Sequence, residues 1–112
     1  MKKTRCSLAL AVLFLYSCKK SAVVYTPDCS GTTKSFATDV SPVIKSYCAT
    51  SGCHDSNSSH GPGALTNYTQ ISGNRTSVRS AVADGSMPQN TTLSNAQKNA
   101  IMCWIDNGAP NN

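Results

Sequence analysis

Two thiols and an imidazole lie close together near the middle of the chain. They belong to the string Cys-Ala-Thr-Ser-Gly-Cys-His, in which four residues separate Cys48 from Cys53 and His54 follows directly. Paired thiols beside an imidazole can close a disulfide, bind a metal ion, or attach a cofactor covalently while the imidazole binds its metal. The compartment, the surrounding elements and any further ligand decide between these chemistries.

The first residues indicate export. Three basic residues within positions 2–5 precede an apolar run over 8–16, which is too short to span a bilayer and is typical of a signal peptide. The run ends in Leu-Tyr-Ser-Cys18, which resembles the lipobox of bacterial lipoproteins. The resemblance implies a lipoprotein signal peptide over 1–17 and a lipidated Cys18; an ordinary signal peptide cut nearby is the alternative. The protein is then expected in the periplasm or on the cell surface, anchored to a bacterial membrane.

Composition argues against several classes of function. Seven basic and five acidic residues remain after position 17, a net charge of +2, and the basic ones form no stripe with aromatic residues. We therefore expect no nucleic-acid partner. The sequence has no nucleophile motif, paired carboxylates or phosphate-binding loop, so we expect neither enzymatic activity nor a small-molecule substrate. Large apolar residues are few, and so small a domain commonly needs a disulfide, a metal or a cofactor to fold.

Three helical segments are expected to position the thiols and imidazole. Residues 18–35 are polar, with Pro and Gly, and predict a flexible tether. The segment 36–47 predicts an amphipathic helix with Asp39 or Ser41 as its N-cap and Pro42 in its first turn, leading directly to Cys48. Its apolar face consists of Val40, Val43, Ile44 and Tyr47.

Two further helices are expected after a polar loop. One spans about 68–83, with Gly73 inside it and Gly85 ending it. The other begins after Ser94 and extends to about Asn107, with Gln97 in a capping-box relation to Ser94. Because no segment alternates like a strand, we expect an all-α fold.

The chain from 36 to 112 resembles the c-type cytochromes. A helix leads into two cysteines followed by histidine, a Met-Pro pair follows at Met87, and the last helix carries Trp104 in the ending Trp-Ile-Asp-Asn-Gly-Ala-Pro. The resemblance is to short mono-haem domains of exported bacterial lipoproteins, although the cysteine spacing is longer than the usual C-x-x-C-H. It implies a cytochrome c-like bundle of three to four short helices around one covalent haem c.

The resemblance also implies roles for individual residues. Cys48 and Cys53 would form thioethers with the haem, and His54 would bind its iron. Gly52 would let the longer spacer bulge outward. The sixth ligand would be Met87, whose thioether suits electron transfer; the alternatives are Met102, expected in the core, and His60, expected in solvent.

Cys29 and Cys103 remain after haem attachment. In an exported protein they are expected to form a disulfide between the tether and the last helix. The alternative is a buried free thiol at Cys103.

The leading hypothesis is one-electron transfer by a membrane-tethered haem that exchanges electrons with redox partner proteins. The main alternative is a structural or binding module of a lipoprotein, without a cofactor and stabilised by Cys48–Cys53 and Cys29–Cys103 disulfides. A zinc site that uses some of the residues Cys48, Cys53, His54 and His60 is a third hypothesis.

Overall fold

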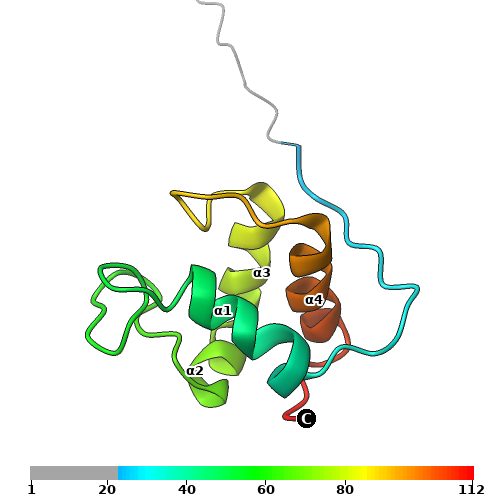
Figure 1. Ribbon diagram of the computed structural model, residues 1–112, viewed down its shortest axis with the longest axis horizontal. Coiled ribbons are helices and arrows are strands. Elements are labelled where there is room, and N and C mark those ends of the chain that lie inside the picture. The colour runs from blue at the N-terminus through cyan, green and yellow to red at the C-terminus, as the bar shows by residue number, and fades with distance from the viewer. Residues whose placement is uncertain (1–22) are drawn as a thin grey trace, which may run out of the picture.

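The computed structural model describes residues 23–112, and within them the chain is all-α, with helices and no strand (Figure 1). The expected signal peptide and Cys18 lie outside the described residues. A short π-helix, η1 (Phe36–Val40), runs directly into α1 (Ser41–Tyr47); α2 (Tyr68–Gly73), α3 (Arg75–Asp84) and α4 (Asn95–Asp106) follow. None of the described helices is long and apolar enough to cross a membrane.

The first helical segment begins at Ser35, so the expectation of an N-cap at Asp39 or Ser41 was wrong. The Ser35 hydroxyl accepts a hydrogen bond from the Thr38 amide, while the Asp39 carboxylate accepts one from the Ser35 amide at 2.7 Å. Asp39 therefore supports the start of the segment from inside η1. The predicted apolar face is confirmed, because Val40 and Ile44 are fully buried, with Val43 and Tyr47 packed against them.

The middle of the chain forms two helices where one was predicted. Asn67 caps α2 through its side chain, and Gly73 ends it. The backbone of Asn74 is not helical. Its side-chain amide donates a hydrogen bond to the Gln70 carbonyl at 2.9 Å, which ends α2 before α3 begins. Local bonding by this Asn competes with a continuous helix. The predicted end of α3 is confirmed, since Gly85 is left-handed with φ of 75°.

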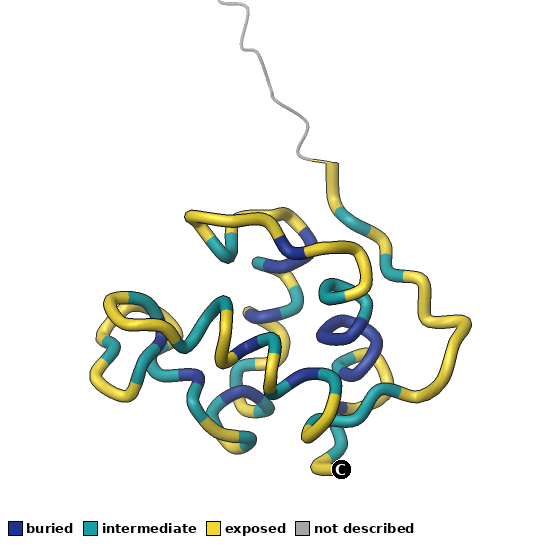
Figure 2. Tube along the Cα trace, in the orientation of Figure 1, coloured by how far each residue is buried: buried dark blue, intermediate teal, exposed yellow. Residues whose placement is uncertain are grey.

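The last helix, α4, follows its prediction closely. Ser94 and Gln97 form the predicted capping box. Trp104 is fully buried, and its ring lies 5.4 Å from the Phe36 ring and 6.4 Å from the Tyr68 ring, centroid to centroid. Its indole N–H donates to the Pro110 carbonyl at 2.8 Å, so the C-terminal turn closes over this aromatic cluster. Figure 2 shows the buried stretches concentrated on the helices, with mostly exposed connecting loops.

The irregular segment before η1 is attached to the helices. Cys29 is joined by a disulfide to Cys103 on α4, as expected for an exported protein. The Tyr25 amide donates to the Ala83 carbonyl at 2.7 Å, and the Tyr25 hydroxyl donates to Oδ1 of Asn99 at 2.9 Å. This part of the expected tether therefore runs along the end of α3 and the side of α4, where Figure 1 shows it in blue and cyan.

Candidate functional site

The loop that carries the two thiols folds back on the end of α1. The Cys48 amide donates to the Ile44 carbonyl at 2.8 Å, and the His54 amide donates to the Cys48 carbonyl at 3.0 Å. The five residues between them, 49–53, are thus looped out while the backbones of Cys48 and His54 stay hydrogen-bonded. Gly52 adopts a left-handed φ of 78° within this loop, and nothing lies within 4 Å of where its Cβ would be. Backbone conformation, rather than lack of space, therefore favours glycine here.

His54 is the one buried polar residue among the described part of the chain, with 6% of its surface exposed. Its Nδ1 lies 2.8 Å from the Gly63 carbonyl oxygen. Because a carbonyl can only accept, Nδ1 carries a proton, and in the neutral imidazole Nε2 is then the nitrogen with the lone pair. Histidine ligands of metals are commonly oriented by such a bond from the other ring nitrogen. The sequence analysis did not identify the Gly63 carbonyl as the hydrogen-bond partner of His54.

A short turn presents this carbonyl to the histidine. The Gly63 amide donates to the His60 carbonyl at 2.5 Å, and Gly63 itself is left-handed, with φ of 96°. The Leu65 amide then donates to the His54 carbonyl at 2.9 Å. The run Gly-Pro-Gly at 61–63 was the sequence signal for such a turn.

Two cavities, of about 440 and 400 Å³, lie beside this loop and have four lining residues in common: Cys48, His54, Gly61 and Met87. We call the two together the hollow. Both volumes fall within the range of small-molecule and cofactor sites. The second cavity has an apolar wall built from α3 and the chain before α2, which the sequence analysis did not identify: Leu65, Val78, Ala81 and Val82.

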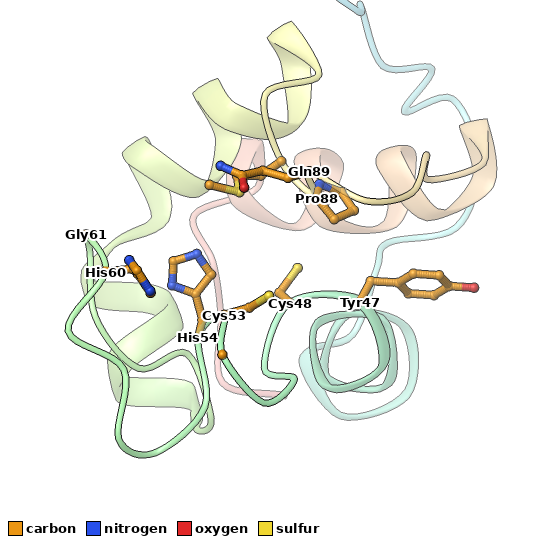
Figure 3. Close-up of a pocket in the computed structure, with 10 residues that line it drawn as sticks. Tyr47, Cys48, Cys53, His54, His60, Gly61, Pro88 and Gln89 are labelled. Carbon is orange, nitrogen blue, oxygen red and sulfur yellow. The ribbon is translucent and has the colours of Figure 1, made fainter.

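The hollow has walls from two separate parts of the chain. Figure 3 shows Cys48, Cys53 and His54 extending from the loop after α1 toward Pro88 and Gln89, which belong to the connection between α3 and α4. That connection starts at Gly85 and also carries Met87, whose amide donates to the Ala81 carbonyl at 3.2 Å. Among residues 23–112, no Asp, Glu, Lys or Arg lines either cavity.

The two thiols that line the hollow are free and half-buried. The pKa of the Cys48 thiol is raised from 9.0 to about 11. Burial is the larger cause, and the negative charge that Cys53 can carry is the smaller one. Cys48 is therefore protonated at neutral pH. Nucleophilic and redox-exchange cysteines have the opposite property, a lowered pKa that yields a thiolate.

The other ligand candidates are separated from one another. Met102 is fully buried in the core, as predicted, and lines neither cavity of the hollow. His60 is exposed and lines the first cavity only. Within residues 23–112, no three His, Cys, Asp or Glu side chains gather as a metal ion would require. The residues considered for zinc therefore do not form such a set, whereas a haem iron takes only its axial ligands from the chain.

The disulfide lies elsewhere on the molecule. Cys29 and Cys103 border a third cavity, of about 240 Å³, formed with Thr32, Lys34 and Asp106 among others. It shares no lining residue with the hollow.

Comparison with known proteins adds no assignment to this geometry. The chain matches no protein-family model, no curated protein and no solved structure. The hollow and its residues therefore carry the functional argument.

Proposed function

We propose that residues 36–112 form a cytochrome c-like domain that transfers single electrons through one covalently attached haem c. The observation that carries the proposal is the convergence of Cys48, Cys53, His54 and Met87 on the hollow, from two separate parts of the chain. These are the residues that the resemblance assigns to attachment and iron binding.

Only one ring nitrogen of His54 is available to bind iron. With Nδ1 bonded to the Gly63 carbonyl, Nε2 is the nitrogen available to a metal, and the bond makes it a better electron donor. Met87 borders the same space and offers a soft thioether, which raises the reduction potential when it binds opposite histidine.

The thiols suit attachment by addition. Cys48 and Cys53 would hold the haem through thioethers, each thiol adding its sulfur to one carbon of a vinyl group and its proton to the other. The reaction has no leaving group and needs no net oxidation. The raised pKa keeps Cys48 protonated at neutral pH, which disfavours it as the attacking thiolate in disulfide exchange.

The remaining residues of the hollow would exclude water. Leu65, Val78 and Val82 are nearly fully buried, and no formal side-chain charge lines the space. Bound there, the haem supplies reversible one-electron iron chemistry, while the chain holds its ligands and sets its surroundings. We propose no enzymatic activity. The partners are redox proteins, and the location is exported, on a bacterial membrane through lipidated Cys18.

Covalent attachment is tested by producing the protein in a host with a haem-attachment pathway. We expect a red protein whose haem stays with the polypeptide in acidified organic solvent and adds one haem to its mass. Cys48→Ser and Cys53→Ser should each leave one thioether fewer. A colourless protein, or haem that is fully extracted, would contradict the proposal and favour the cofactor-free disulfide module.

The sixth ligand is tested with a matched pair of methionine variants. Met87→Ala should abolish the far-red absorption of methionine bound to ferric haem and lower the reduction potential. Met102→Leu is the control, because Met102 is buried outside the hollow; its spectrum should match the unmodified protein. An unchanged spectrum in Met87→Ala would exclude Met87 as ligand.

A further inference from the structure

The chain before η1 is attached to the domain where that chain begins, at Tyr25, close to the junction of α3 and α4. Tyr25 donates its amide to the Ala83 carbonyl and its hydroxyl to Asn99. The Asp28 amide donates to the same Asn99 oxygen at 3.1 Å, and the Lys98 ammonium lies 4.8 Å from the centre of the Tyr25 ring. Four contacts therefore hold residues 25–28 against α3 and α4, independently of the disulfide.

The same segment is fixed again further along. Cys29 is covalently bound to Cys103 in the middle. At the lower end, the Ser35 hydroxyl donates to the Asn112 carbonyl at 2.9 Å and the Phe36 amide donates to Oδ1 of Asn112 at 2.8 Å. We call residues 25–35 the strap. It belongs to the folded domain, so the free tether must end at Tyr25.

The strap greatly shortens the reach of any anchor at Cys18. Seven residue steps separate Cys18 from Tyr25, which span at most ~25 Å when fully extended. A tether that ran freely to Phe36 would have eighteen steps and reach ~60 Å. A domain of this size is about 30 Å across. At ~25 Å the short tether is shorter than the domain is wide, so it disfavours contact between the opposite end and the bilayer, whereas a ~60 Å tether would allow every face to touch it.

Resting on the lipid anchor proposed for Cys18, we propose that the strap orients the domain, with the junction of α3 and α4 facing the bilayer. Val23 and Val24 support this orientation, because they are the exposed large hydrophobic residues of the described chain, 91% and 61% exposed, and directly precede the strap. Figure 1 shows this junction at the end of the domain opposite to α2 and the C-terminus. The Met87 side of the hollow begins at Gly85 and therefore lies toward the membrane.

The orientation is tested with the full lipidated protein in phosphatidylcholine nanodiscs that contain a gadolinium-chelating lipid. Gadolinium broadens amide NMR signals steeply with proximity, so each amide of the reduced protein reports its nearness to the bilayer. We expect the greatest loss of signal at residues 83–86 and 94–99, and the least at α2 and residues 109–112. Equal loss over the whole domain, or greatest loss at α2, overturns the inference.

Two variants separate the strap from the anchor. A Gly-Ser insertion as long as the strap, placed between Val24 and Tyr25, leaves every strap contact intact and should make the signal loss weaker and even. An insertion variant with the original uneven pattern overturns the inference, because something other than tether length then orients the domain. Cys18→Ser should show no loss. If the lipidated protein also shows no loss of signal, it does not bind the bilayer and the proposed lipid anchor is wrong. That result differs from an even loss over the domain, which contradicts only the orientation.

Discussion

Removing the disulfide by the double substitution Cys29→Ser and Cys103→Ser should destabilise the domain by about 4 kcal/mol. The two cysteines are 74 residues apart, and cross-linking a loop of that length lowers the entropy of the unfolded chain by an amount worth about 4 kcal/mol at 25 °C. Small domains have only ~5 to 15 kcal/mol of total stability, so this is a large share. In a domain of this size it corresponds to a fall of ~20 °C in Tm.

The loss is measured by urea denaturation followed by far-ultraviolet circular dichroism, on protein with haem in both samples. Reducing agent provides the control: it should lower the stability of the unmodified protein to that of the variant and leave the variant unchanged. A difference below about 1 kcal/mol, or one that persists in reducing agent, would refute the loop-entropy reasoning. A difference that persists in reducing agent would mean that serine packing at position 103, rather than loop closure, explains the change in stability.

Three further predictions concern single positions. Gly52→Ala should destabilise the domain by about 1 to 2 kcal/mol and lower the yield of attached haem, because alanine is strained at φ of 78°; Gly73→Ala, at a helical position with room for a Cβ, should be neutral or stabilising in the same denaturation assay. In protein made without haem attachment, the rate of Cys48 alkylation, followed by mass spectrometry, should keep rising up to about pH 11, and fast alkylation at pH 7 would contradict the raised pKa. The free energy of unfolding should not depend on Cys48 below pH 9.0 and should fall between pH 9.0 and about 11, where the unfolded chain loses the thiol proton and the folded one keeps it. Ser94→Ala should cost about 1 kcal/mol in urea denaturation by removing the capping box of α4, and no measurable loss would show that its Gln97 partner suffices.

Local signals in the sequence predicted most of the helices. Ser94 with Gln97 marked the start of α4, and Gly85 marked the end of α3, because caps depend on a few adjacent residues. The break at Asn74 was missed because the apolar spacing continues across it. What ends α2 is a bond from the Asn74 side chain to a carbonyl one turn back, and the same side chain is tolerated within many helices.

The candidate site also has a part that the sequence predicts and a part that only the folded structure reveals. Cys48, Cys53, His54 and Met87 are recognisable by residue type and order, and the structure places all four around the hollow. The Gly63 carbonyl is a backbone group, and every residue has one, so only the folded turn reveals its partner. The strap is also a tertiary feature: its polar composition predicts a tether, and its contacts come from residues some 70 positions away.

The position of the disulfide has a consequence for how the protein matures. Cys48 and Cys53 lie inside the loop that Cys29 and Cys103 close, so the oxidation that forms the disulfide must select one pair among four thiols. In the unfolded chain Cys29 meets Cys48, nineteen residues away, more readily than Cys103, by about 1 kcal/mol of loop-closure entropy. Docking of α4 beside the strap before oxidation would favour the Cys29–Cys103 pair and leave the inner two thiols free for the proposed haem.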